Sequence, residues 1–158
     1  MTDGFPPTAD VVALLNANRG GFEIAIGLVF TRASPQEVAC EVPVGAHLTQ
    51  PYGLVHGGVY ASIVETVASV GAALVAMPRG QTTVGLENST TFLRAVRGGR
   101  LVGVGTPLHA GRTTQVWEVE VRDDEGRLVA KGRVRMQCLE SGARVAGETV
   151  ALKPPRDG

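Results

Sequence analysis

The sequence has few aromatic residues and no excess charge of either sign. Phe, Trp and Tyr together make up 4% of the 158 residues, and fifteen basic side chains balance fifteen acidic ones. A nucleic-acid-binding protein needs a basic field, commonly with aromatic rings between the basic residues. Nucleic acid is therefore not an expected partner, and an acidic small ligand would need a local cluster of basic side chains.

Cysteine is also scarce, with Cys40 and Cys138 as its two occurrences. Both lie in apolar runs typical of strands, which favours buried, reduced thiols over the alternatives of a disulfide or a metal site. The spacings HxxxH and CxxC do not occur in the sequence. We therefore expect no metal and no other cofactor.

The first ten residues, MTDGFPPTAD, contain neither a basic region nor an apolar run. A secretory signal peptide requires both of these features. We therefore expect a cytoplasmic protein, and its length is that of one domain of ordinary size.

One long apolar segment, from residue 58 to residue 77, contains no proline and is followed by Pro78, which cannot continue a helix. At roughly 1.5 Å per residue this helix would measure about 30 Å, which is also the thickness of a bilayer core. Glu65 at its middle argues against a membrane span, because a buried acid there costs roughly 2.5–3.5 kcal/mol. We therefore expect a helix buried by a sheet, and no membrane partner.

Strand patterns lie on both sides of this helix. A short helix at residues 9–18, capped by Thr8, comes first. Two strands precede the long helix and four follow it, at residues 22–30, 37–44, 81–95, 100–109, 113–122 and 128–139. Short turns between the last four impose antiparallel pairing. The pattern predicts an α+β domain at residues 21–140, with an arm and short helix at residues 1–20 and a tail at residues 141–158.

Helix geometry constrains any chemistry on the long helix. Gly57 and Gly58 stand at its N-terminus, where unpaired amides and the helix dipole favour negative charge. Ser69 follows Glu65 by four residues and shares its face. Eight residues separate Gly57 from Glu65, about 12 Å along the helix axis. Both can act on one carbonyl carbon only if helices of two subunits run past each other.

The pattern Gln50-x-x-Gly53-x-x-His56-Gly57-Gly58, followed by Glu65 and Ser69, resembles the hotdog-fold acyl-CoA thioesterases. It is most similar to the PaaI-like branch with a glutamate in the helix, which includes 4-hydroxybenzoyl-CoA and 1,4-dihydroxy-2-naphthoyl-CoA thioesterases. The likeness spans roughly residues 20 to 140, with further blocks at residues 84–87, 92–94, 107–111, 116–119 and 124–128. It implies a hotdog fold, in which a curved antiparallel sheet wraps one long central helix.

The resemblance also implies roles for five residues. Glu65 would attack the thioester carbonyl or act as general base on water, and the Gly57 amide would stabilise the oxyanion. Gln50 would bind or polarise the carbonyl, and Ser69 would hold the hydrolytic water. His56 would fix the loop or contact the thioester. The alternatives are an inert acid near the rim, a histidine satisfied by backbone and a small serine packed under the sheet.

For the phosphates of CoA the resemblance points to Arg94, Arg112 and Thr113, on strand ends and a turn. Arg112 departs from the pattern, because the 4-hydroxybenzoyl enzyme has a small hydroxyl residue at that position. For each arginine the alternative is a solvated surface charge. Ser62 has no GxSxG context, which argues against a serine-hydrolase triad.

Together these features predict an acyl-CoA thioesterase that acts on an aryl-CoA, as a homodimer with shared sites that assembles into a homotetramer. A non-catalytic module that binds acyl-CoA is one alternative, and the joint presence of Glu65, Gln50 and Ser69 argues against it. A dehydratase of the same fold is another, although those sites pair a histidine and an acid in a different arrangement.

Overall fold

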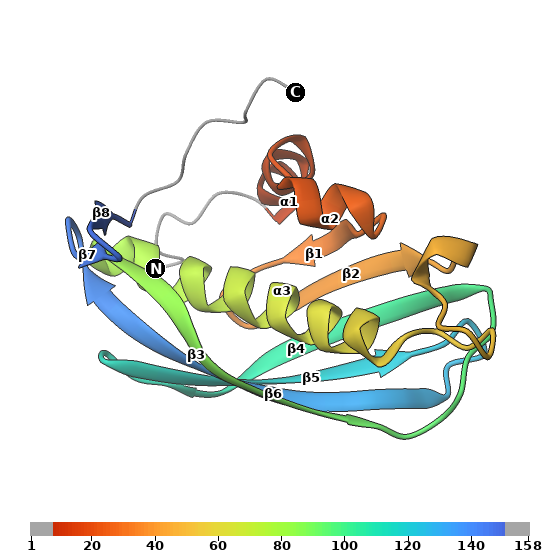
Figure 1. Ribbon diagram of the computed structural model, residues 1–158. Helices are drawn as coiled ribbons and strands as arrows, with labels where there is room; N and C mark the ends of the chain where they lie inside the picture. Colours follow the sequence, from red (N-terminus) through yellow and green to blue (C-terminus); the bar gives the residue numbers. More distant parts are fainter. Residues whose placement is uncertain (1–7, 151–158) are drawn as a thin grey trace.

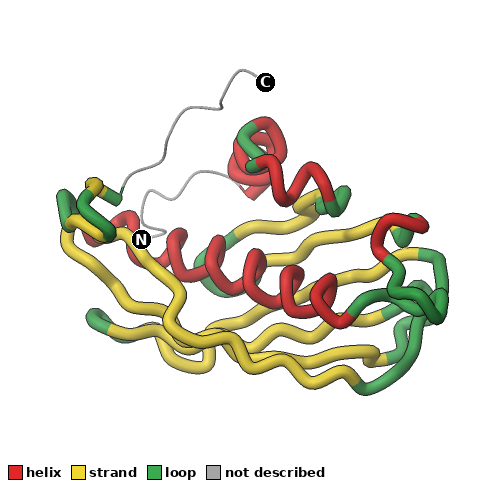
Figure 2. Tube along the Cα trace, viewed as in Figure 1, coloured by secondary structure: helices red, strands yellow, loops and turns green. Residues whose placement is uncertain are grey.

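The computed structural model describes residues 8–150, which form one antiparallel sheet curved around a central helix (Figures 1 and 2). The helices are α1 (Thr8–Ala17), α2 (Gly21–Ala25) and α3 (Gly57–Ala76), with 3-10 turns η1 (Ala46–Leu48) and η2 (Met77–Arg79). The strands are β1 (Val29–Ala33), β2 (Val38–Pro43), β3 (Gln81–Phe92), β4 (Arg100–Ala110), β5 (Thr114–Arg122), β6 (Leu128–Glu140), β7 (Arg144–Val145) and β8 (Glu148–Thr149). The main sheet has the order β1-β2-β4-β5-β6-β3. The predicted architecture is confirmed.

The predicted strand at residues 22–30 is wrong over its first half. Residues 21–25 form α2, because the amides of Ile24 and Ile26 bond to the carbonyls of Gly20 and Phe22. Gly27 then adopts a φ of 71°, a left-handed turn that glycine takes without strain, and β1 starts at Val29. A short apolar run has the same composition in a helical turn as in a strand, so the pattern alone did not separate them.

The last stretch also differs in part from the predicted tail. Residues 144–149 form the small hairpin β7–β8, in which Arg144 bonds through its side chain to the Gly147 carbonyl. Residues 1–7 of the predicted arm and residues 151–158 of the predicted tail lie outside the described part. Both cysteines are free and buried, and burial raises the pKa of Cys40 to about 12. The prediction of reduced, buried thiols is confirmed.

Helix α3 is buried along one broad face by the concave side of the sheet. Half of its 20 residues are buried, and Ile63, Val64 and Val67 are fully inaccessible. Each such side chain stabilises the fold by roughly 1.5–3 kcal/mol. Small residues let the sheet approach, and Gly71 lies directly under the indole of Trp117 on β5. By length and apolar composition, the stretch Gly57–Arg79 would also pass as a membrane-crossing helix. However, 61% of an apolar 18-residue window within it is buried inside the protein.

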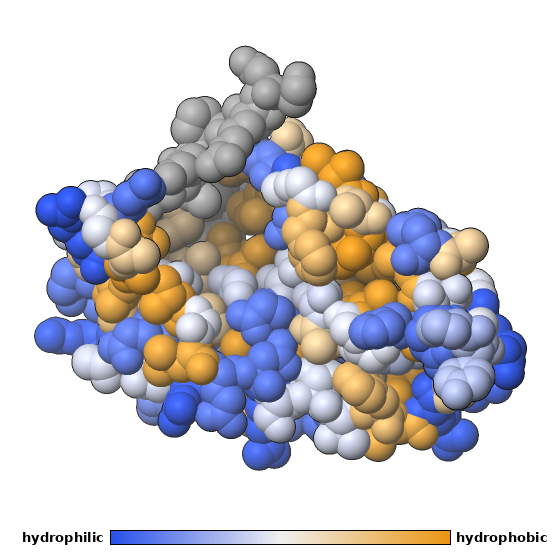
Figure 3. Space-filling view, viewed as in Figure 1, coloured by the Kyte–Doolittle hydropathy of each residue, from blue (hydrophilic) through white to orange (hydrophobic). Residues whose placement is uncertain are grey.

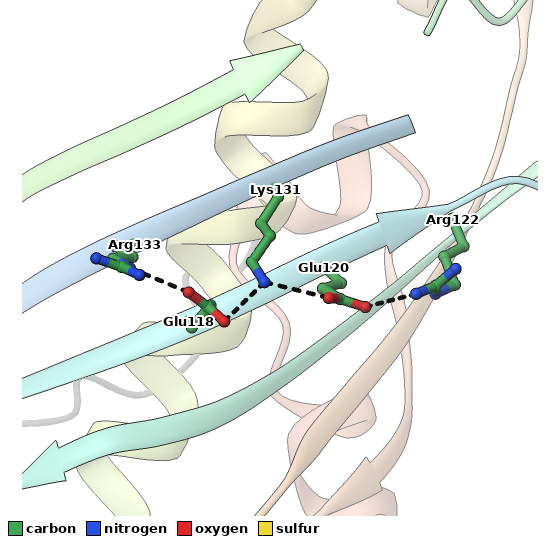
Figure 4. A network of polar contacts seen from close by, with 5 residues as sticks. All are labelled: Glu118, Glu120, Arg122, Lys131 and Arg133. Carbon is green, nitrogen blue, oxygen red and sulfur yellow. Dashed lines mark hydrogen bonds and ion pairs between the residues drawn. The ribbon is translucent and has the colours of Figure 1, made fainter. Parts of the chain in front are cut away.

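The convex face of the sheet carries a network of ion pairs (Figure 4). Lys131 on β6 lies between Glu118 and Glu120 of β5, and Arg133 and Arg122 complete the row. Hydrogen bonds from Lys131 and then from Arg133 lower the pKa of Glu118. A lowered folded-state pKa means that the network contributes at neutral pH and is lost as the pH falls through that pKa. This face is polar and solvated.

The two edge strands of the sheet, β1 and β3, differ in the hydrogen bonding of their outer sides. At β1, the side chain of Asn16 on α1 bonds to both the amide and the carbonyl of Phe30, which closes that edge. At the other edge, β3 pairs on one side with β6. Among the described residues no element pairs with its other side. Exposed edges of this length are sites for pairing with another chain.

Several large apolar side chains are exposed, and two sets of them lie on the outer helices and on β3. Leu14, Phe22 and Ile24 of α1 and α2 are each more than half exposed, and Figure 3 shows apolar surface where these helices lie. Leu86 and Phe92 of β3 are also more than half exposed. The second set accompanies the open edge.

Gly71 provides a test of how closely α3 is packed. A Cβ at this position would lie 2.4 Å from two ring atoms of the buried Trp117. Gly71→Ala is expected to lower the free energy of unfolding by about 1–2 kcal/mol, because overpacking outweighs the gain in helix propensity.

Chemical denaturation measures this change, and Gly98→Ala is the matched control. Nothing lies within 4 Å of a Cβ at Gly98, so a shift below about 0.5 kcal/mol is expected there. Equal or greater stability of Gly71→Ala would contradict the packing.

Candidate active site

A cavity of about 330 Å³ opens where the loop before α3, the start of α3 and the end of β3 meet. Gln50, Gly57 and Arg94, three of the predicted site residues, all line it. Its remaining walls are largely apolar: Leu54, Val55, Tyr60, Phe92, Leu93 and Ala95. The structure therefore brings these three residues together around one largely apolar space.

The start of α3 leaves one amide for a ligand. His56 is the N-cap residue, and its Nδ1 accepts a hydrogen bond of 2.9 Å from the Gly58 amide. The Val59 amide bonds to the His56 carbonyl. Gly57 is the first helical residue, and its amide has no acceptor within the helix. His56 thus fixes the loop, as one of its two predicted roles requires, and the Gly57 amide is the donor that remains.

Gln50 lies in the loop that leads to this helix start. Its side-chain oxygen accepts a hydrogen bond from the Tyr52 amide, and its backbone bonds to Gly53 and Leu54. With the oxygen held inside the loop, the side-chain amide group is left to donate. A donor beside the Gly57 amide is the arrangement that would polarise a carbonyl oxygen.

Tyr60 and Phe92 form an aromatic wall of the cavity. Their ring centroids are 5.8 Å apart, and Tyr60 is 3% exposed. The Tyr60 hydroxyl is buried without a hydrogen-bond partner. Burial raises the pKa of this phenol, and the negative charge of Asp123 raises it further, so Tyr60 is neutral in the physiological range. In a chain with seven aromatic residues, two of them line this one cavity.

Glu65 is partly buried at the middle of α3, and neighbouring groups hold both of its carboxylate oxygens. Asn88 on β3 donates from Nδ2 to Oε2 at 2.9 Å, and Ser69 donates from Oγ to Oε1 at 3.4 Å. The structure thus places Ser69 beside Glu65, as the sequence predicted. An acid held in this way can accept a proton or attack a carbonyl carbon.

The remaining predicted residues lie elsewhere. Arg112 and Thr113 lie in the β4–β5 turn near the C-terminal end of α3, whereas Arg94 lies near its N-terminal end. Arg112 borders a second cavity, of about 280 Å³, together with Arg79 and Gln81. Within one chain the three predicted CoA ligands therefore do not form one site, and Gly57 remains about two turns from Glu65.

The sequence analysis missed Asn88 and Gly85. A Cβ at Gly85 would lie 2.7 Å from Oε1 of Glu65, so glycine leaves the room in which this oxygen lies. The available signal was the isolated glycine inside a predicted strand, which often marks a bulge or a close approach. Among residues 8–150, no group of three His, Cys, Asp or Glu side chains is arranged to hold a metal ion.

Comparisons with known proteins show the family and the fold of this chain. The Thioesterase superfamily matches residues 52–130. An esterase of Mycobacterium tuberculosis is 39% identical over 137 residues, which cover 85% of this chain and 97% of that protein, and its solved structure superposes with a TM-score of 0.74. The proofreading thioesterase EntH of Klebsiella pneumoniae is 39% identical over 129 residues, 81% of this chain and 93% of that protein.

A crystal structure of thioesterase HI1161 from Haemophilus influenzae superposes with a TM-score of 0.76 at 26% identity, and covers 87% of this chain and 93% of that one. The match to the family extends over α3 with Glu65 and over β3, β4 and β5. The chain is therefore a hotdog-fold thioester hydrolase and belongs to the Thioesterase superfamily.

Proposed function

We propose that this protein hydrolyses an aryl-CoA thioester to the free acid and CoA. The observation that carries the proposal is a carboxylate held by two donors, Glu65, in a chain that also offers a free helix-N-terminal amide at Gly57. The carboxylate activates water or attacks the carbonyl carbon, the oxyanion forms against the amide, and the C–S bond breaks to release the thiol. Gln50 adds a second donor to the carbonyl oxygen.

The aromatic wall of the cavity supports the aryl preference. Tyr60 and Phe92 present two rings beside Gly57, and an aromatic acyl group can pack on them in offset or edge-to-face geometry. The relative EntH is named a proofreading thioesterase, which is consistent with hydrolysis of a thioester.

The open edge of β3 supports a homodimer. Asn16 blocks the opposite edge of the sheet, so β3 is the edge at which a second copy can extend it. A Cβ at Gly57 would lie 2.6 Å from the ring of Phe92, so Gly57 lies beside that end of β3. In the same way, Glu65 lies beside Gly85 of β3. Antiparallel pairing that sets Gly57 opposite the partner's Glu65 therefore centres the twofold axis midway between Phe92 and Gly85.

The same pairing would reunite the CoA ligands. It sets the end of β3 that carries Arg94 beside the partner's β3 start, near the turn with Arg112 and Thr113. Two cavities that lie apart in one chain would then flank a single substrate. The tetramer expected from the resemblance would require a further contact surface in addition to this edge.

We also propose that the protein acts in the cytoplasm.

The role of Glu65 is tested by Glu65→Gln, which keeps the size of the side chain and removes its charge. Turnover of an aryl-CoA is expected to fall by at least about a hundredfold, the low end for loss of a positioned acid–base group. A thiol reagent that detects free CoA measures the rate, and calorimetry should show that substrate still binds.

Wild-type turnover in this variant would contradict the mechanism. Absence of CoA release by the wild-type protein, across a panel of aromatic and aliphatic acyl-CoAs, would instead indicate a binding module.

The shared site is tested by mixing two inactive variants. Gly57→Pro removes the amide donor, and proline suits the backbone of the first helical position, although the Phe92 ring must shift because a Cβ here would approach it to 2.6 Å. Glu65→Ala removes the carboxylate. Co-refolded heterodimers contain one intact site of two, so activity is expected to return to about a quarter of the wild-type value in a statistical mixture, in which half of the dimers are mixed.

Circular dichroism and light scattering verify that each variant folds and assembles. Mixing that restores no activity, with both variants dimeric, would place Gly57 and Glu65 in separate sites.

The nucleotide end is tested by Arg94→Ala. Arginine suits a phosphate because its planar fork donates two hydrogen bonds. KM for aryl-CoA is expected to rise, with a loss of roughly 1.5–3 kcal/mol of binding free energy. Little change in kcat is expected, because the phosphates are remote from the reacting carbon.

The matched control is an aryl-pantetheine thioester, which lacks the nucleotide and should be affected little. Equal damage with both substrates would assign Arg94 to the acyl pocket or the fold.

A further inference from the structure

We propose that Asn88 is the positioning residue for Glu65, and that it holds Oε2 so that Oε1 is the oxygen that reacts. This inference rests on the proposed function, because it assigns work to the two oxygens of one carboxylate. Asn88 touches Glu65 in the structure and is not needed to touch the substrate.

The contacts of Asn88 fix its amide completely. Nδ2 donates to Glu65 Oε2 at 2.9 Å and to the Ala61 carbonyl of α3 at 3.0 Å. Oδ1 accepts a hydrogen bond of 2.6 Å from the Thr90 hydroxyl. Because the Ala61 carbonyl and the Glu65 carboxylate can only accept, the nitrogen side must face the helix. The sheet therefore presents one donor to Glu65 from outside the helix.

A bulge in β3 is what brings Asn88 to this face. Gly85 pairs with Met136 of β6, and Asn88 pairs with Val134. Met136 and Val134 are both buried against the helix side of the sheet, although Gly85 and Asn88 are three residues apart in β3. In a regular strand, residues three apart point to opposite faces. The register shift between Gly85 and Glu87 inserts one extra residue, and so places both Gly85 and Asn88 against α3.

The surroundings of the two oxygens differ. Oε2 has the short bond to Asn88, whereas Oε1 has the long bond, 3.4 Å, to Ser69. Oε1 also faces Gly85, where a Cβ would come within 2.7 Å. Glycine at this position lets the β3 backbone lie beside Oε1 without a clash. Oε1 keeps the weaker of the two hydrogen bonds, so it is the oxygen that is left to react.

Either chemical route then uses Oε1. As a base, Oε1 takes one proton from water while the water oxygen bonds to the carbonyl carbon, and the proton passes to the thiolate as the C–S bond breaks. As a nucleophile, Oε1 itself bonds to the carbonyl carbon, the thiolate leaves with a proton from water, and hydroxide from that water cleaves the anhydride. In both routes Asn88 keeps the reacting oxygen aimed, and a misplacement of about 1 Å can cost a hundredfold in rate.

A double-mutant cycle tests the proposal. Asn88→Ala is expected to lower kcat by about ten- to a hundredfold, with KM within about twofold of wild type, because a group that acts through Glu65 does not bind substrate. In the Glu65→Gln background the same substitution is expected to change residual turnover by less than about twofold. Thr91→Ala, on the convex face of the same strand, is the matched control and should leave kcat unchanged.

Asn88→Asp tests whether the hydrogen bond from Asn88, and not the shape of its side chain, positions Glu65. Aspartate has the same shape but cannot donate when ionised, so its kcat is expected to be at least as low as that of Asn88→Ala. Thr90→Val, which removes the bond to Oδ1 and keeps Asn88, should give a smaller loss that also disappears in the Glu65→Gln background. It keeps the test informative if Asn88→Ala destabilises the fold.

Wild-type kcat in Asn88→Ala, rescue by Asn88→Asp, or equal losses in both backgrounds would overturn the proposal for Asn88 and leave the proposed function intact. Full activity of Glu65→Gln alone would instead overturn the proposed function. The two failures are therefore distinguished by the single variants of the same cycle.

Discussion

Burial of α3 by one curved sheet is the constraint on which the rest of the structure depends. The helix is too apolar to lie on a surface and too short of polar contacts to stand alone, so the strands must curve around it. Glycines and alanines on the helix and the sheet set the distance between them, as the contact of Gly71 with Trp117 shows. All further features are consequences of where this helix begins, which face it buries and which strand borders its polar side.

The polar side of α3 faces β3, and this places the carboxylate at a boundary rather than in the core. Glu65 lies on the partly buried flank of the helix, within reach of Asn88 and Ser69. A charge in the apolar interior would cost several kcal/mol, and a partly solvated charge with two donors costs less. Glu65 therefore lies at the border of the core, next to the strand whose outer edge is open.

A single chain contains both the Gly57 amide and the Glu65 carboxylate, but they lie too far apart to act on one carbonyl carbon. The amide of Gly57 and the carboxylate of Glu65 are fixed by one rigid helix, and rigidity keeps them apart. The free edge of β3 supplies the route by which a second helix can approach in the opposite direction. In the proposed homodimer, stability of the sheet edge, assembly and catalysis would all depend on this one strand.

The sequence by itself determined the long helix, its glycine start, the acid at its middle and the antiparallel strands around it, because apolar periodicity and turn residues act locally. Through its resemblance to a family, the sequence also predicted Gln50, Gly57, Glu65 and Ser69 as site residues, and the structure places Ser69 beside Glu65 and Gln50 in the cavity with Gly57. Local pattern failed at residues 22–30, where a helical turn and a strand have the same composition. Only the tertiary structure decided that Asn88 faces Glu65, because one extra residue in β3 reverses the side-chain alternation. It also decided that Arg94 and Arg112 lie at opposite ends of α3, since the distance between segments depends on how the sheet wraps the helix and not on their separation along the chain.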